Sequence, residues 1–220
     1  MTRLLILGRR PYRETLALMR ELHGQVARGE ASDTWLVVEH EPVITLGRNT
    51  KAENVLIAAD ALAARGIALF AVERGGDATY HGPGQLAVYP IVRLERFREV
   101  VPLVSALERS VVAALAAFGI PAQARSEHRG VYVGENAICA IGLAVKQMTS
   151  LHGLALNVST ELDYDRLITP CGTPQFGITS LSHELRRTVR IGDARDELLT
   201  ALESEFALTF TRDRAIGEVA

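Results

Sequence analysis

The chain has 220 residues, of which 48% are hydrophobic and 23% charged, and its formal net charge is −2. A chain of this length can bury a sizeable core, and its charge gives no broad attraction to nucleic acid or to an anionic membrane. Its apolar N-terminal run is too short for a signal peptide, no segment approaches the ~20 apolar residues of a membrane span, and the two cysteines lack metal-type spacing. We therefore expect a cytoplasmic protein with no nucleic-acid or membrane partner.

Hydrophobic periodicity predicts alternating strands and helices in the first half of the chain. The strands are expected over residues 4–7, 35–38, 43–46 and 67–72, and the helices over residues 11–26, 58–65 and 100–118. From Gly130 onward, short apolar runs separated by turns predict the hairpins of a mixed or antiparallel sheet. A loop-like stretch over residues 165–181 and an amphipathic helix over residues 195–206 follow. Because no linker divides the chain, we expect a single domain over residues 1–220.

The stretch RGGDATYHGPGQLAVYP, residues 74–90, is the strongest candidate for a binding site. Glycine allows a backbone to approach a ligand closely, and ordering such a glycine-rich loop costs chain entropy. Gly82, Gly84 and Ala87 match the dinucleotide pattern G-x-G-x-x-A, but Pro83 removes a backbone donor and a strand-like segment follows instead of a helix. A tight structural turn is the other reading, although it leaves Arg74 and the polar side chains of the same loop unexplained.

The two cysteines differ in their surroundings. Cys139 lies in the apolar run AICAIG, as a buried structural cysteine does, whereas Cys171 lies in the loop P-C-G-T-P, which suits a presented nucleophile. A thiol needs a nearby cation or base for activation. By residue type, the side chains that could serve as this cation or base are His81, His152, Lys146 and Lys51. His152 is equally open to being a site residue, a half-buried histidine with its hydrogen bonds satisfied, or neither. A reactive cysteine beside a loop of donors indicates acyl transfer.

These motifs, together with GVYVG, ICAIG and LHGLALNV, resemble the lipoyl(octanoyl) transferase family, the octanoyl-ACP:protein octanoyltransferases of lipoate biosynthesis. The resemblance covers residues 35–180. It implies the biotin/lipoate protein ligase fold, of class α/β (α+β), with a mixed, largely antiparallel sheet, flanking helices and a smaller sheet region. It also implies that octanoyl passes from acyl carrier protein to the enzyme cysteine and then to a lysine of a lipoyl domain.

The resemblance assigns roles to individual residues. Cys171 matches the acyl-accepting nucleophile, and three segments match the substrate-binding wall. These are Arg74, Gly75, Gly76, Asp77, Ala78, Thr79, Tyr80 and His81, then Ala140, Ile141 and Gly142, and then Gly153, Leu154 and Ala155. The implied partners are octanoyl-acyl carrier protein, the lipoyl domains of 2-oxoacid dehydrogenase complexes and the glycine cleavage H protein. No cofactor and no metal are expected.

One position departs from the family pattern. The family has a lysine directly before the ICAIG segment, where it lowers the pKa of the cysteine and relays protons, and this chain has Ala137 there. Three explanations stand: an engineered inactivating substitution, compensation by Lys146 or His81, or a homologue that no longer transfers. The first is favoured because the other motif positions are intact.

Two rival functions remain open at this point. An ATP-dependent lipoate or biotin-type ligase would form an acyl-adenylate and need no cysteine. The presence of the P-C-G loop and the lack of an arginine-rich nucleotide loop both count against such a ligase. A non-catalytic acyl-binding or carrier-binding protein gains support only from Ala137. A zinc site built from His81, His152 and a cysteine fits no known spacing.

Overall fold

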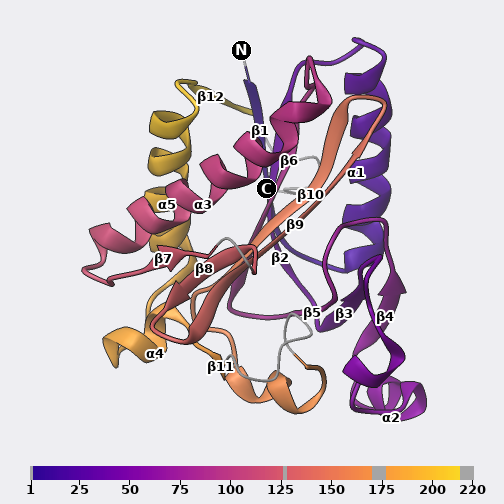
Figure 1. Cartoon of the computed structure of the whole chain (residues 1–220), viewed down its shortest axis with the longest axis vertical. Coiled ribbons are helices and arrows are strands. Elements are labelled where there is room, and N and C mark those ends of the chain that lie inside the picture. The colour runs from indigo at the N-terminus through magenta and orange to yellow at the C-terminus, as the bar shows by residue number, and fades with distance from the viewer. Residues whose placement is uncertain (1, 126–127, 170–176, 214–220) are drawn as a thin grey trace, which may run out of the picture.

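A large central sheet organises the computed structural model, which describes residues 2–125, 128–169 and 177–213 (Figure 1). Within these residues the sheet has nine strands. Eight lie side by side in the order β12 (Phe210–Asp213), β1 (Thr2–Arg10), β2 (Thr34–His40), β6 (Gln85–Ile91), β10 (Thr149–Asn157), β9 (Asn136–Lys146), β8 (Gly130–Val133) and β7 (Gln123–Ala124), and β11 (Gly177–Ile178) pairs with β9. Five neighbouring pairs are antiparallel, so the expected mixed, largely antiparallel sheet is confirmed.

A smaller sheet lies beside the large one, at the lower right of Figure 1. Its central strand β3 (Val43–Leu46) is parallel to β4 (Ala68–Ala71) and antiparallel to β5 (Ala78–His81). The short helix α2 (Ala59–Ala64) connects β3 to β4 and packs Leu62 against Ile44. This is the smaller sheet region that the family resemblance implies.

Helices cover both faces of the large sheet. Successive side chains of a strand point to opposite faces, so Leu4 packs into one hydrophobic cluster and Leu5 into the other. The first cluster lies under α3 (Val100–Ala117) and α5 (Ile191–Glu205), and the second lies under α1 (Tyr12–Ala27). Burial on both faces explains why the central strands are almost continuously apolar.

The predicted elements correspond to the observed ones apart from several boundaries, since α5 begins at Ile191 and not at residue 195, and β5 lies within the stretch predicted as a loop. β1 extends past the predicted residues 4–7 into Arg9 and Arg10, whose polar side chains hide the strand from a hydrophobicity pattern. The stretch 165–181 is also less loop-like than expected where the structure describes it. The remaining short elements are η1 (Ala52–Asn54), η2 (Phe97–Glu99), η3 (Leu162–Arg166) and α4 (Leu181–Leu185).

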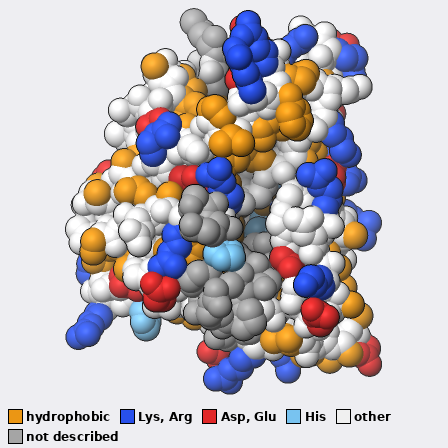
Figure 2. Space-filling model, in the orientation of Figure 1, with side chains coloured by type: hydrophobic (Ala, Val, Ile, Leu, Met, Phe, Trp, Pro, Cys, Tyr) orange, Lys and Arg blue, Asp and Glu red, His pale blue; other side chains and the backbone are white. Residues whose placement is uncertain are grey.

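The helical segment Phe97–Ala117 is long and apolar enough, by length and composition alone, to cross a membrane, which the sequence analysis does not anticipate. Its buried residues, including Leu107 and Val111, instead fill the core beneath the sheet. Its start exposes Phe97 and Val101, and Figure 2 shows hydrophobic and basic side chains mixed over the upper part of this face. The apolar composition of the helix therefore reflects its place in the core.

Leu107 provides a test of this core. Its side chain is fully buried between α3 and the sheet, so Leu107→Ala should leave a cavity and lower the free energy of unfolding by about 2–5 kcal/mol. The matched control is Leu56→Ala, because Leu56 is 54% exposed and its truncation should change that free energy by about 0.5 kcal/mol or less. Urea unfolding followed by circular dichroism measures both, and equal losses would contradict the assignment of α3 to the core.

Candidate active site

A cavity of about 400 Å³ opens between the large sheet, the smaller sheet and the first turns of α3. All the residues predicted to form the substrate-binding wall line this cavity, except Ala78 and Tyr80. They are Arg74 to Asp77, Thr79 and His81, then Ala140 to Gly142 from β9, and Gly153 to Ala155 from β10. These segments meet because β9 and β10 pair in register, with Ala140 opposite Ala155 and Gly142 opposite Gly153. A cavity of this size suits a small ligand.

A second cavity, of about 30 Å³, adjoins the first and holds Ala78 and Tyr80. Thr79, Ala140 and Ala155 line both cavities, so they form the partition between them. Ala137 also lines the second cavity, opposite Tyr132 in the β8–β9 ladder, and is buried. The side chain that replaces the family lysine thus faces a space next to the main cavity.

Two glycines allow backbone segments to approach one another here. A Cβ on Gly142 would lie 2.9 Å from the carbonyl oxygen of Gly75, whose own N–H donates to Leu143 O at 2.9 Å. A Cβ on Gly153 would collide with the carbonyl oxygen of Val88 on the neighbouring strand. The glycines of ICAIG and LHGLALNV therefore permit the close packing that forms the cavity wall.

A buried line of hydrogen bonds runs behind the cavity. Arg74 donates from Nη2 to the carbonyl oxygen and Oγ1 of Thr45, both at 2.8 Å, and Thr45 Oγ1 lies 3.2 Å from His81 Nε2. His81 Nδ1 lies 2.7 Å from Gln85 Oε1, which can only accept, so the proton of the neutral ring is on Nδ1. Gln85 Nε2 then donates to Asn157 Oδ1 at 2.9 Å. These bonds account for both ring nitrogens of His81.

Aromatic rings form the adjoining inner wall. Tyr12 stacks on His81 at 6.1 Å, and His40 lies edge-on to both rings. His40 Nε2 lies 2.7 Å from the hydroxyl of Tyr89. Burial lowers the pKa of His40 to about 4 and, with the nearby charges of His40 and Arg74, holds the pKa of His81 well below its usual range. Both histidines are therefore neutral at physiological pH.

His152 lines the main cavity with its backbone at φ +62°, a conformation that side chains other than glycine adopt rarely. Its Nε2 lies 3.6 Å from Glu73 Oε2, and Glu73 also binds Arg20 Nη2 at 3.0 Å. Contact with His152 lowers the pKa of Glu73, whereas burial lowers the pKa of His152. A neutral imidazole thus faces a carboxylate across 3.6 Å, and the buried Nε2 of His152 has no hydrogen-bond partner among the described residues.

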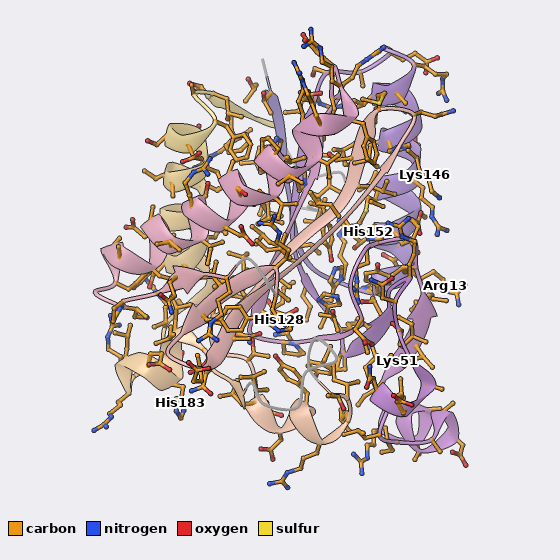
Figure 3. All side chains as sticks on the ribbon, viewed as in Figure 1. Arg13, Lys51, His128, Lys146, His152 and His183 are labelled. Atoms are coloured by element: carbon orange, nitrogen blue, oxygen red, sulfur yellow. The ribbon has the colours of Figure 1, made fainter. Side chains whose placement is uncertain are left out.

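Neither lysine of the sequence lies at the cavity. Lys146 is nine residues from Ala137 along the same strand, about 30 Å away, and its Nζ lies 3.6 Å from Glu73 Oε1. Lys51 is 72% exposed and pairs with Glu53 at 3.9 Å. Figure 3 shows Lys146 toward the upper right and Lys51 toward the lower right, away from His128 near the centre. Compensation by Lys146 for Ala137 is therefore wrong.

Several lining residues escape sequence reasoning. Tyr12 belongs to a helical stripe that predicts only core packing, and Val100 and Val104 come from the first turns of α3. His128 and Arg129 come from the segment before β8 and carry no motif. Cys171 lies outside the described residues. Within those residues, no three His, Cys, Asp or Glu side chains gather as they would around a metal ion.

Comparison with known proteins places this site in a family. Residues 11–203 match the lipoyl protein ligase A/B catalytic domain. The chain belongs to this family. It is similar to the octanoyltransferase of Solibacter usitatus, with 46% identity over 167 residues and 76% of each protein covered. It is also similar to the octanoyltransferase of Alkaliphilus metalliredigens, with 42% identity over 202 residues, 91% of this chain and 93% of that protein.

A solved structure of a bi-partite lipoate protein ligase and its E2 lipoyl domain from Thermoplasma acidophilum shares the fold of this lipoyl protein ligase A/B family member. The TM-score is 0.78 at 20% sequence identity, covering 99% of this chain and 88% of the other. The biotin/lipoate protein ligase fold expected from the sequence is thus confirmed.

The neutral histidines of this family member predict how its stability depends on pH. The pKa of His40 is about 4 in the folded state, whereas an unfolded chain has a histidine pKa of about 6.5, so below that pH only the unfolded chain gains the proton. His40 alone should therefore lower the free energy of unfolding by about 2 kcal/mol between pH 7 and pH 5. Urea titrations across this range measure the slope.

Two variants separate this effect from general acid sensitivity. His40→Gln removes the titrating ring and should flatten the dependence between pH 7 and pH 5, whatever its stability at pH 7. His183→Gln is the control, because His183 is exposed on α4 and its replacement should leave the slope unchanged. A slope in His40→Gln equal to that of the parent would refute the assignment.

Proposed function

We propose that this chain transfers an octanoyl group from octanoyl-acyl carrier protein, through a thioester on Cys171, to a lysine of a lipoyl domain. The observation that carries the proposal is the meeting of three motif segments at one pair of cavities, in a chain whose relatives are octanoyltransferases. Cytoplasmic location and the glycine cleavage H protein as an alternative acceptor are part of the same proposal.

The cavity chemistry supports an acyl ligand. Ile141, Leu154 and Leu143 provide apolar wall, and Val100 and Val104 add to it from α3. Burying the six methylenes of an octanoyl chain at about 0.8 kcal/mol each could supply roughly 5 kcal/mol. That difference favours a medium-length chain over a short one. The guanidinium of Arg74 donates to Thr45 and to Gly75 O, so it stiffens the wall beside the acyl chain.

The place of the nucleophile is supported by its described neighbours in sequence. Ile168 and Ile178 both line the smaller cavity, and Ile178 pairs with Ala137. Cys171 follows Ile168 by three residues in the sequence. We therefore propose that the thioester forms at the smaller cavity, with the acyl chain directed past the partition into the larger one.

The transfer has two steps. The Cys171 thiolate attacks the thioester carbonyl of the donor, its bond to the acyl carbon forms as the donor C–S bond breaks, and the thiol proton ends on the released carrier thiol. The acceptor amine then attacks the enzyme thioester, its C–N bond forms as the C–S bond breaks, and the proton that the nitrogen loses ends on the released Cys171 thiol. Lipoyl domains are proposed acceptors because a related lipoate protein ligase has an E2 lipoyl domain as its partner.

An ATP-dependent ligase is the second candidate, because lipoate protein ligases share the fold. A ligase would join free octanoate to the lipoyl domain in the presence of ATP and would retain this activity in Cys171→Ser. The octanoyltransferase relatives, which match at about twice the sequence identity of the ligase structure, favour thioester transfer.

Intact-mass spectrometry tests the proposed transfer directly. Mixing the protein with octanoyl-acyl carrier protein should add the mass of one octanoyl group, because the thioester is covalent, and proteolysis should locate the group on the peptide that contains Cys171 and not on that with Cys139. Cys171→Ser should add none. Ala137→Lys is measured in parallel and should also acylate.

The outcomes are distinct. Acylation of only Ala137→Lys would identify Ala137 as a lesion in the transfer mechanism. Failure of both proteins to acylate, together with tight binding of octanoyl-acyl carrier protein, would support the non-catalytic binding protein. Acyl transfer from free octanoate and ATP in Cys171→Ser would support the ligase.

A further inference from the structure

We propose that the main cavity contains a subsite for a hydroxyl group, built on Nδ1 of His152, and that it receives a medium-chain acyl group with a hydroxyl far from its carbonyl. The inference rests on the proposed function for the acyl class of the ligand. It concerns which chains are preferred, and neither the nucleophile nor proton transfer enters into it. Its failure and the failure of the proposed function therefore give different results.

The imidazole of His152 lies between the cavity and a carboxylate. His152 is 2% exposed and lines the main cavity, and its Nε2 lies 3.6 Å from Oε2 of Glu73, which is not part of the wall. Figure 3 shows His152 further inside the molecule than Lys146. Nε2 is the enclosed nitrogen of the ring, and Nδ1 has no hydrogen-bond partner among the described residues. Since the cavity is the space that His152 borders, Nδ1 is the nitrogen that a ligand can reach.

Glu73 determines which ring nitrogen carries the proton. Arg20 donates from Nη2 to Oε2 at 3.0 Å and from Nε to Oε1 at 3.4 Å, and Lys146 Nζ lies 3.6 Å from Oε1. Contact with His152 and then with Arg20 lowers the pKa of Glu73, so the carboxylate is ionised. A lone pair on Nε2 would be repelled by this charge, whereas an N–H is attracted to it. The neutral ring therefore carries its proton on Nε2 and leaves a lone pair on Nδ1.

The backbone of His152 is held in a conformation that favours glycine. Its φ is +62°, and its N–H donates to Met19 Sδ, a weak acceptor, at 3.2 Å. The next residue, Gly153, packs directly against the carbonyl oxygen of Val88. Backbone strain that a fold maintains is concentrated at ligand sites. The strained position thus holds a hydrogen-bonding side chain at the cavity where a glycine would fit without strain.

A hydroxyl group is the ligand chemistry that suits this acceptor. The lone pair on Nδ1 needs a donor, which excludes keto and ether oxygens. A carboxylate has no proton to donate and would bring a second negative charge near Glu73. An ammonium would meet the positive charge of Arg74, which lines the same cavity and, after burial, lowers the pKa of His152. An uncharged hydroxyl donates its proton to Nδ1 and avoids both charges.

The subsite lies away from the partition between the two cavities. His152 is three residues from Ala155 on β10, and Leu143, which pairs with it, is three residues from Ala140 on β9. These intervals separate the subsite from the partition by about 10 Å. An acyl chain that has its carbonyl at the partition and extends along these strands brings its distal carbons to His152. We therefore expect the preferred chain to carry its hydroxyl on one of its last three carbons.

A competition experiment tests the proposal. Octanoyl-acyl carrier protein is mixed in equal amount with a carrier whose octanoyl chain bears a terminal, penultimate or antepenultimate hydroxyl, and intact-mass spectrometry distinguishes the two acyl-enzymes by one oxygen atom. At least one hydroxylated chain should load as fast as octanoyl or faster. His152→Phe removes the acceptor and should lower the ratio of hydroxylated to plain product about 10-fold or more, because the hydroxyl is then buried unpaired. Loading of octanoyl by this variant shows that it is folded, and the control His183→Gln should keep the parent ratio.

The tautomer of His152 provides a readout that does not depend on activity. In proton–nitrogen correlation spectra of the histidine rings, Nδ1 of His152 should have the shift of a nitrogen without a proton. Free hydroxyoctanoate should move this resonance, and octanoate should leave it in place. Glu73→Gln should give a mixture of both tautomers, since an amide can face either form of Nε2. A purely structural contact between Glu73 and His152 would not have this effect.

The outcomes are separable. Discrimination of about 10-fold or more against all three hydroxylated chains in the parent, an unchanged product ratio in His152→Phe, or a proton on Nδ1 would each overturn the subsite. Failure of the parent to load any chain would instead overturn the proposed function. In that case the response of the Nδ1 resonance to free hydroxyoctanoate decides the subsite, and no response would overturn it.

Discussion

A single buried line of hydrogen bonds joins the two sheets and determines the shape of the site. It begins at Arg74, passes through Thr45 and His81 on the smaller sheet, and crosses by Gln85 to Asn157 on the large sheet. Asn157 Nδ2 lies 3.1 Å from the hydroxyl of Tyr164, beyond the partition. Buried polar groups are costly when unpaired, so each bond in this line depends on its neighbours.

The same line explains how a polar motif can border an apolar cavity. The side chains of His81 and Gln85 direct their polar atoms at one another, so ring faces, glycine backbone and aliphatic groups make up part of the cavity wall, beside charged residues such as Arg74 and Asp77. Burial keeps the imidazoles of His40 and His81 neutral, so neither ring requires a counterion. The charges at the acyl site are therefore those of Arg74, Asp77 and Arg129, and Arg129 pairs with Glu108 at 3.1 Å.

Sequence reasoning places the motif segments correctly in the fold because their geometry is local. Gly142 and Gly153 mark close approaches of backbone, and the hairpin pattern aligns β9 with β10. Periodicity distinguishes the buried face of a helix from its exposed face, but it does not show where a buried face borders a cavity. For that reason Tyr12, Val100 and Val104 are predicted only as core.

His128 shows the same limit more clearly. No spacing relates it to the glycine loop, and only the pairing of β8 with β9 and the contact of Glu108 with Gly130 bring it to the site. The position of Lys146, by contrast, follows from chain length alone, since a continuous strand of nine residues separates it from Ala137. Separation along an unbroken element can be judged from sequence, whereas contact across elements requires the packed structure.

The partition between the cavities has a consequence for how such an enzyme can diversify. Thr79, Ala140 and Ala155 all have small side chains, and each of them lines both cavities. One or two extra methyl groups at these positions would thicken the partition, and removal of methyl groups would open it, while the hydrogen-bonded line behind the wall would stay in place. Substrate range is thus adjustable independently of the scaffold, through steps as small as single-residue changes.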